Sequence, residues 1–380
     1  MPSTARAHLR EESRDLNDTS PSTSRVLNGA QAILEATTQA LEQDPRVFVL
    51  GEGVTDPKGV FGTTKDLVDR FGRQRICEMP VAENGWTGMA IGAAMCGQRP
   101  ILVHQRVEFA LLAFEQLANN AAKAHYVTGG RHRVPLVVRL VVGRGWGQGP
   151  MHSQCLEGVF AQIPGLKVAL PATADDAKGL LLGAIADDSP VVIIEHRWIH
   201  YATGVVESAA VPRPLDGPQR RHQGDALTVV SSSYMTLETL RACQALSAHG
   251  VDVDLFDLRV ARPLALDGIV ESVRRTGRLL TIDTGHREFG LGAEIVATVC
   301  QHALHSLQAP PRRMGLPSHP TPSSAALAGA YYPRSPEIAV EIAELVGAGV
   351  DRTHACVAEL RAERDRLPID VPHPSFRGPF

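Results

Sequence analysis

The segment MPVAENGWTGMAIGAAMCG at Met79–Gly97 places a carboxylate ahead of several small residues. Glu83 lies at the turn between an expected strand and an expected helix, and Gly85, Gly88 and Gly92 follow at spacings of three and four. That spacing puts the glycines on one helical face, where another backbone or a flat ligand can approach closely. A carboxyl group left partly buried there suits proton transfer, because burial favours the protonated form. Glu83 could equally be an ordinary carboxylate at a helix N-terminus, stabilised by the helix dipole.

A second candidate is His152, which lies in the sequence GQGPMHSQ at Gly147–Gln154. Imidazole titrates near neutral pH, so a histidine in a loop can orient an acidic substrate and handle protons. A loop histidine is also commonly a solvated turn residue. The residue type alone therefore leaves the role of His152 open.

The composition excludes several classes of partner and site. The chain of 380 residues has 38 Lys and Arg against 41 Asp and Glu, a formal net charge of −3. This balance argues against nucleic acid or an anionic membrane as the main partner. No apolar run approaches the roughly 18 residues that a membrane span needs, and Arg139 interrupts the best candidate, Val134–Val142. The six cysteines are scattered without a CxxC pair, so neither a zinc site nor a disulfide framework is indicated.

The first 24 residues are rich in Ser, Thr and Arg and lack the apolar core of a secretory signal. Four acidic residues in this stretch argue against a transit peptide: Glu11, Glu12, Asp15 and Asp18. We therefore expect residues 1–24 to be a disordered arm, and the protein to be cytoplasmic.

The elements that must position these side chains alternate between strands and helices over residues 25–203. The expected strands are Val47–Leu50, Arg75–Glu78, Ile101–Val103, Pro135–Val142 and Val191–Glu195. The expected helices are Leu27–Gln43, Asp66–Phe71, Asn84–Cys96, Leu111–His125 and Asp175–Asp187. This alternation predicts a mostly parallel sheet covered by helices on both faces.

A Pro-rich stretch at residues 204–224 is predicted to be an exposed linker, after which the alternation resumes over residues 225–348. Expected strands there are Ala226–Val230, Val251–Asp257 and Leu279–Asp283, and expected helices are Leu237–Ala248, Leu266–Arg275, Gly292–Leu304 and Pro336–Val346. Pro310–Pro322 is expected to be a loop. Residues 349–380 are expected to form a charged helix, Asp351–Arg366, and an extended tail. The predicted fold class is α/β, with two doubly wound domains.

Several collinear blocks resemble the beta subunit of the first component of 2-oxo acid dehydrogenase complexes, of the pyruvate and branched-chain type. This family belongs to the transketolase superfamily of thiamine diphosphate enzymes. The resemblance covers roughly Val26–Val346. In the first domain its blocks are VFVLGEGV at Val47–Val54, PVAENGWTGMAIGAAMCGQRP at Pro80–Pro100, NNAAKAHYVTGG at Asn119–Gly130, GQGPMHSQ at Gly147–Gln154 and PGLKVALPATADDAKGLLLGAI at Pro164–Ile185. In the second domain they are RPLALDGIVESV and FGLGAEI. It implies a pyrimidine-binding domain over residues 25–203 and a transketolase C-terminal-like domain over residues 225–348.

The resemblance assigns thiamine diphosphate as cofactor and gives roles to individual residues. Glu83 matches the catalytic glutamate, bonded to a ring nitrogen of the aminopyrimidine, where proton sharing lets the cofactor's own nitrogen deprotonate the thiazolium carbon. Phe109 matches the aromatic residue that packs on the aminopyrimidine, and Gln105 is placed with the cofactor-binding residues. His152 matches the active-site histidine near the reactive carbon. Glu52 matches a carboxylate lining the polar path between paired active sites.

A structural potassium site is also implied by the resemblance. Five residues fall where the family's beta subunit holds the ion, largely through backbone carbonyls: Leu136, Ala184, Ile185, Asp187 and Ser189. Hard oxygen ligands would suit such an ion. Ser189 stands where the family usually has Asn.

The superfamily motif that holds the diphosphate and Mg²⁺ is a GDG segment followed later by Asn, and it is not found in this sequence. Gly224–Asp225 leads directly into an expected strand without a third Gly. The resemblance therefore implies a separate alpha subunit that carries the GDG motif and joins this chain in a heterotetramer.

Three readings of the activity follow. The chain could be the beta subunit of a 2-oxo acid dehydrogenase that passes an acyl group to a lipoyl domain. Alternatively, it could serve transketolase-like transfer of a two-carbon unit to another acceptor, such as an acyl carrier protein. The third reading, a non-catalytic scaffold, is disfavoured because a scaffold needs neither Glu83 nor His152.

The sequence departs from the pyruvate and branched-chain pattern around the expected pocket. His104, Gln105 and Arg106 replace mainly apolar or aromatic residues, and the loop GRGWGQG adds Arg144 and Trp146. We expect a pocket more polar than a branched-chain site, suited to a hydroxylated or anionic donor. Arg106 or Arg144 could equally bind the alpha subunit or a neighbouring carboxylate.

Overall fold

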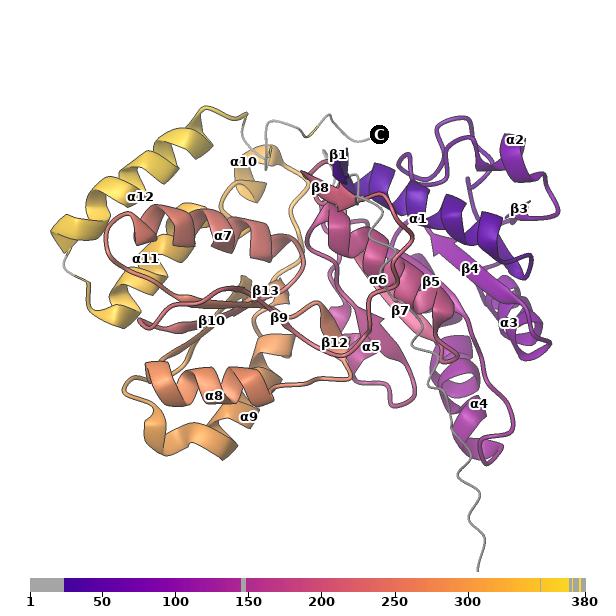
Figure 1. Ribbon diagram of the computed structural model, residues 1–380. Helices are drawn as coiled ribbons and strands as arrows, with labels where there is room; N and C mark the ends of the chain where they lie inside the picture. The colour runs from indigo at the N-terminus through magenta and orange to yellow at the C-terminus, as the bar shows by residue number, and fades with distance from the viewer. Residues whose placement is uncertain (1–23, 145–147, 349, 369–370, 372–375, 377–380) are drawn as a thin grey trace, which may run out of the picture.

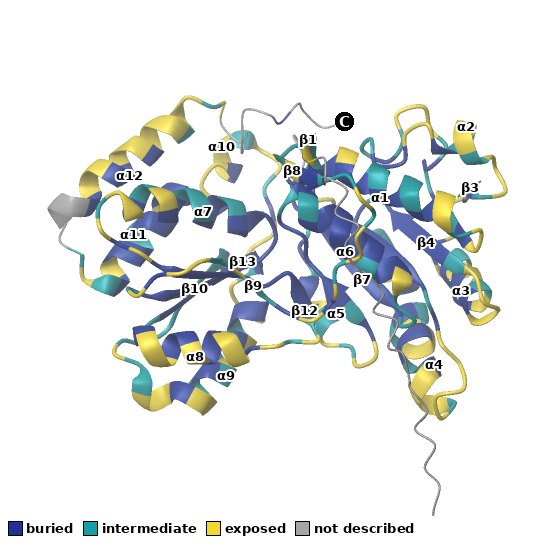
Figure 2. Cartoon of the chain, viewed as in Figure 1, coloured by how far each residue is buried: buried dark blue, intermediate teal, exposed yellow. Residues whose placement is uncertain are grey.

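Two mostly parallel sheets, each flanked by helices, stand side by side in the computed structural model (Figure 1). The structure describes residues 24–144, 148–348, 350–368, 371 and 376. The expected disordered arm, apart from Ser24, and much of the expected extended tail lie outside the described residues. Buried residues concentrate in the strands and on the helix faces that cover them (Figure 2).

The first sheet has seven strands in the order β12-β6-β7-β5-β4-β2-β3. They are β2 (Val47–Gly51), β3 (Ile76–Glu78), β4 (Arg99–His104), β5 (Val137–Val142), β6 (Lys167–Ala169), β7 (Val191–His196) and β12 (Val260–Arg262). All neighbours pair in parallel except β12, which is antiparallel to β6. The central strands are mostly apolar because helices cover both faces. Arg139 in β5 is accommodated by a buried ion pair with Glu195 in β7, Nε to Oε1 2.6 Å.

The helical segments of this half begin with α1 at Gly29. They are α1 (Gly29–Gln43), α2 (Leu67–Phe71), α3 (Glu83–Met95), the 3-10 helix η1 (Phe109–Ala113), the π-helical turn η2 (Gln116–Ala121), α4 (Ala122–Val127), α5 (Glu157–Ala161) and α6 (Ala174–Ala186). The helix expected from Leu27 begins two residues later, because Asn28 and Gln31 form a capping box at its start.

The second sheet has five strands in the order β14-β13-β10-β11-β9. They are β9 (Gln219–His222), β10 (Thr228–Ser231), β11 (Asp254–Asp257), β13 (Leu279–His286) and β14 (Arg312–Leu316). Its helices are α7 (Tyr234–Ser247), α8 (Asp267–Thr276), α9 (Leu291–Ala303), the 3-10 helix η3 (Leu304–Ser306), α10 (Ala325–Ala328), α11 (Ser335–Val346) and α12 (Val350–Asp365). The predicted α/β fold class with two mostly parallel sheets is confirmed.

Two segments expected to be irregular contain strands instead. The stretch predicted as a linker contains β8 (Thr203–Glu207), which pairs antiparallel with β1 (Ser24–Asn28), and β9, which pairs with β11. The loop predicted at Pro310–Pro322 contains β14, which pairs in parallel with β13. In each case a strand distant in sequence supplies the hydrogen bonds. Local composition does not reveal such a pairing.

The long helix expected at Leu111–His125 is divided into η1, η2 and α4. At the wider π turn, Gln116 donates to Asn84 Oδ1 in α3 at 3.3 Å and accepts from Asn120 Nδ2 at 2.8 Å. Side-chain amides that bond in this way compete with a regular helix. The segment is helical as predicted, but it is not one continuous α-helix.

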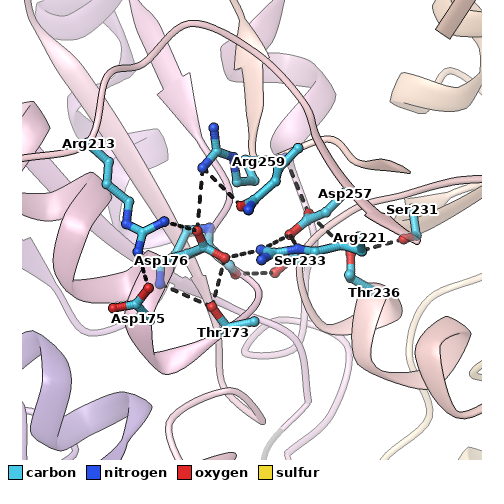
Figure 3. A network of polar contacts seen from close by, with 12 residues as sticks. Thr173, Asp175, Asp176, Arg213, Arg221, Ser231, Ser233, Thr236, Asp257 and Arg259 are labelled. Carbon is cyan, nitrogen blue, oxygen red and sulfur yellow. Dashed lines mark hydrogen bonds and ion pairs between the residues drawn. The ribbon is translucent and has the colours of Figure 1, made fainter. Parts of the chain in front are cut away.

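Buried ion pairs connect the two halves of the molecule (Figure 3). Arg221 of β9 lies between Asp176 of α6 and Asp257 of β11, with Nη2 2.6 Å from Asp257 Oδ2. Arg259 approaches Asp176 from the other side at 3.6 Å. Since both carboxylates are fully buried, these arginines hold the halves in a fixed relation.

Candidate functional site

A cavity of about 650 Å³ opens where the loops after β2 and β4 meet the loop that precedes α5. Three of the expected cofactor and catalytic residues line it, namely Gln105, Phe109 and His152, and so does Arg106 from the expected substrate pocket. Loops at the carboxyl ends of neighbouring parallel strands are the usual place for a ligand site in an α/β sheet. The remaining walls come from residues 56–62 and Gln148.

Glu83 is the first residue of α3 and only 4% exposed. Within the part of the chain that the structure describes, no residue donates a hydrogen bond to its carboxylate. Glu52 follows β2, whose carboxyl end lies beside that of β3. Burial raises the pKa of Glu52, and the carboxylates of Glu83 and Glu78 raise it further. The two carboxyl groups therefore lie close enough to repel each other, and no ion pair with either is found among the described residues.

Glu52 leaves its Oε1 atom buried without a hydrogen-bond partner among the described residues. A buried polar atom without a partner is costly, so a ligand that donates and accepts hydrogen bonds is expected here. The flat aminopyrimidine of thiamine diphosphate, with ring nitrogens and an amino group, fits this requirement. Glu83, Glu52 and the nearby Phe109 are the residues of this chain that would hold it.

Glu78, which sequence reasoning missed, fixes the loop that carries Glu52. Its carboxylate accepts hydrogen bonds from the Gly53 amide at 2.6 Å, the Thr55 amide at 3.1 Å and the Thr55 hydroxyl at 2.9 Å. Gln105 holds the same loop from β4, because its Nε2 donates to the Glu52 carbonyl at 3.0 Å. The only sequence signal for Glu78 was its place at the end of an expected strand.

His152 lies beside two residues of the turn that follows β4. Its Nδ1 atom contacts a carboxylate oxygen of Glu108, and its ring centroid is 5.8 Å from that of Phe109. The His152 side chain is 45% exposed, whereas that of Glu108 is 12% exposed. Glu108 can therefore orient the imidazole while the other ring nitrogen stays available to a substrate. Sequence reasoning missed Glu108, which is one carboxylate within VEFALL.

Two residues expected in the substrate pocket do not line this cavity. His104 is buried at the end of β4, and burial lowers its pKa to about 4. Arg144 is 1% exposed and donates to the backbone carbonyls of Pro322 at 3.1 Å and Ser323 at 2.7 Å. Arg144 thus contacts the second half of the molecule. Trp146 lies outside the described residues.

The five residues of the implied potassium site gather where α6 ends and β7 begins. The guanidinium of Arg99 is bonded there, with Nη1 donating to the carbonyls of Ile185 at 2.9 Å and Asp187 at 3.1 Å. The Leu136 carbonyl accepts from the Val191 amide at 2.9 Å. Three of the five backbone oxygens expected to bind a metal are therefore already bonded to donors of the chain, and with Arg99 in place the arrangement does not fit potassium.

None of the helices in the described segments is both long enough and apolar enough to cross a membrane.

Comparisons with known proteins agree with this geometry. The model of the transketolase pyrimidine-binding domain matches residues 26–199, and that of the transketolase C-terminal domain matches residues 218–338. A solved split-gene transketolase, described as an inactive beta4 tetramer, has the same fold. Its TM-score is 0.69 at 20% identity, over 84% of this chain and 98% of that chain.

Two curated relatives are more similar in sequence. The chain is 36% identical over 280 residues to the pyruvate dehydrogenase E1 component subunit beta of Rickettsia bellii, covering 74% of this chain and 86% of that protein. It is also 36% identical over 325 residues to the beta subunit of acetoin:2,6-dichlorophenolindophenol oxidoreductase of Cupriavidus necator, covering 83% of this chain and 96% of that protein. The chain therefore belongs to the family of E1 component beta subunits, a thiamine-diphosphate-dependent family of transketolase type.

Proposed function

We propose that this chain is the beta subunit of a heteromeric enzyme that decarboxylates a 2-oxo acid and passes the acyl group to a lipoyl domain or another carrier. The observation that carries the proposal is a pair of carboxyl groups, the buried Glu83 and the partly buried Glu52, beside the cavity that Phe109 and His152 line. The relatives named as pyruvate dehydrogenase and acetoin oxidoreductase subunits support decarboxylation or oxidation over ketol transfer.

When bound, thiamine diphosphate would supply a carbon nucleophile and an acceptor for the electron pair left behind when CO₂ departs. Glu83 would share a proton with a ring nitrogen of the cofactor, and Phe109 would pack against the flat ring. His152, oriented by Glu108, holds or moves a proton at the carbonyl oxygen of the 2-oxo acid.

An alpha subunit carrying the GDG motif completes the proposal, because it would hold the diphosphate and Mg²⁺. Helix α3 offers a suitable surface. Gly85 and Gly92 are exposed there, and a Cβ atom at either would meet nothing within 4 Å. The exposed apolar side chains of Val81, Met89 and Met95 belong to the same region. We propose that this face enters a large interface in a heterotetramer.

A cytoplasmic location is part of the proposal. All six cysteines are free, which suits a reducing compartment.

Reconstitution with the alpha subunit tests the proposed function. We expect the complex to release CO₂ from at least one member of a panel of 2-oxo acids, with an artificial electron acceptor present. Ketol transfer from a ketose without CO₂ release would contradict the proposal and support the transketolase-like alternative.

Arg99 leads to a prediction about potassium. We propose that its guanidinium bridges the Ile185 and Asp187 carbonyls in place of the ion. Replacing sodium by potassium should then change the melting temperature of the complex by less than about 1 °C. A site that bound potassium, at a potassium concentration about 100 times its Kd, would instead raise the free energy of unfolding by roughly 2.7 kcal/mol. Differential scanning calorimetry in the two salts measures this.

The variant Arg99→Ala should melt at a lower temperature and gain stabilisation from potassium, because the carbonyls are released. Arg133→Ala is the matched control, since Arg133 also pairs with Asp188 but is exposed and does not donate to these carbonyls. A potassium-specific rise of several degrees in the wild-type protein would contradict the assignment.

A further inference from the structure

Arg106 is a buried cation in the wall of the 650 Å³ cavity. Its side chain is bonded to neutral acceptors: Nη1 donates to the Gly143 carbonyl at 2.8 Å, and Nη2 is bonded to the Gln148 side-chain oxygen. Its Nε atom is buried without a hydrogen-bond partner among the described residues. The residue is only 3% exposed, so water does not compensate for the missing bond.

No carboxylate of the described residues lies within ion-pair distance of Arg106. A second cation lies near it, because Arg106 and Arg197 lie 5.3 Å and 4.3 Å from the centre of the same Phe61 ring. Burial and the charge of Arg197 lower the pKa of Arg106 to about 10, so the side chain is still cationic at neutral pH. The carboxylate on its own turn, Glu108, is bonded to His152.

A guanidinium in such surroundings has a strong preference for an anion. Burying a cation with neutral acceptors is unfavourable, whereas a carboxylate can accept two parallel hydrogen bonds from the planar fork. The Gln148 side chain now bonded to Nη2 is neutral, so a carboxylate could displace it with a gain in interaction energy. The cavity lining also contains Lys58 and Asp56, whose opposite charges offset each other, so Arg106 supplies the unbalanced positive charge.

We infer that Arg106 binds a carboxylate of the donor substrate, in the cavity that also presents Phe109 and His152. The inference rests on the proposed function, because the donor is taken to be a 2-oxo acid. The carboxylate is either the C1 group of the acid or a second acidic group at the far end of its chain. Both sources offer the same chemistry to the guanidinium, and kinetics with two donors separates them.

The test compares 2-oxobutanoate, whose chain is uncharged, with 2-oxoglutarate, which has a second carboxylate. The kcat and KM for CO₂ release by the reconstituted complex are measured for wild type, Arg106→Gln and Arg106→Lys. Lys65→Met serves as control, because it removes an exposed positive charge outside the cavity lining. Losing a charged hydrogen bond should raise KM by about tenfold to a hundredfold.

A rise in KM of Arg106→Gln for 2-oxoglutarate alone would identify the second carboxylate as the bound group, and a rise for both donors would identify the C1 carboxylate. Arg106→Lys should recover part of the loss in either case. Values of KM within twofold of wild type for both donors would overturn the inference, even with a lowered melting temperature. A wild-type complex that turns over no 2-oxo acid would instead contradict the proposed function.

Discussion

The variant Glu83→Gln is expected to lose turnover by about 10³-fold or more in the assembled enzyme. The amide has nearly the same size as the carboxylate, but it cannot share a proton with a ring nitrogen of the cofactor. Glu83 makes no hydrogen bond with the described residues, so its loss should not weaken the fold. CO₂ release from a 2-oxo acid measures turnover, and size-exclusion chromatography with light scattering measures assembly.

Asp69→Asn provides the matched control. Asp69 is also an acidic residue in the first turn of a helix, α2, but it is exposed. The control should keep wild-type turnover, because it removes only a solvated charge. Activity of Glu83→Gln within a few-fold of wild type would show that Glu83 is not the proton-sharing residue.

The second large effect is expected at the histidine and its carboxylate partner. His152→Ala should reduce kcat by about a hundredfold or more, because the group that handles the proton at the substrate is gone. Added imidazole should restore part of the rate. His125→Ala is the control, because His125 is exposed in α4 and, among the described residues, its ring bonds to the His132 carbonyl alone.

Glu108→Gln should lower kcat by a smaller factor and leave KM unchanged, because the amide can still contact the ring but does not carry the balancing charge. Glu108→Asp should recover part of the rate. An unaltered kcat in both His152→Ala and Glu108→Gln would mean that the pair plays no part in the chemistry.

The alternation of apolar strands and helices was enough to predict the central strands of both sheets. Strands such as β4 and β7 are buried on both faces and contain continuous apolar runs, Ile101–Val103 and Val191–Ile194. Strands β8, β9 and β14 are short or partly exposed, and they form because a distant strand offers its free edge. Single-sequence patterns carry no information on such pairings.

The same distinction applies to the candidate site. The family resemblance assigned Gln105, Phe109 and His152 to one site, and these three residues do line the cavity. The partners Glu78 and Glu108 escaped notice, because a lone carboxylate has no distinctive spacing. Their roles depend on hydrogen bonds across the fold, to Thr55 and His152 respectively.

We propose that this chain binds the aminopyrimidine ring of the cofactor and that a second subunit must bind the diphosphate. Isothermal titration calorimetry with thiamine diphosphate and Mg²⁺, on the chain alone and on the complex with the alpha subunit, tests it most directly. We expect the complex to bind thiamine diphosphate saturably, and the chain alone to show no binding at micromolar concentrations of the cofactor. Binding of micromolar or tighter affinity to the isolated chain would contradict it.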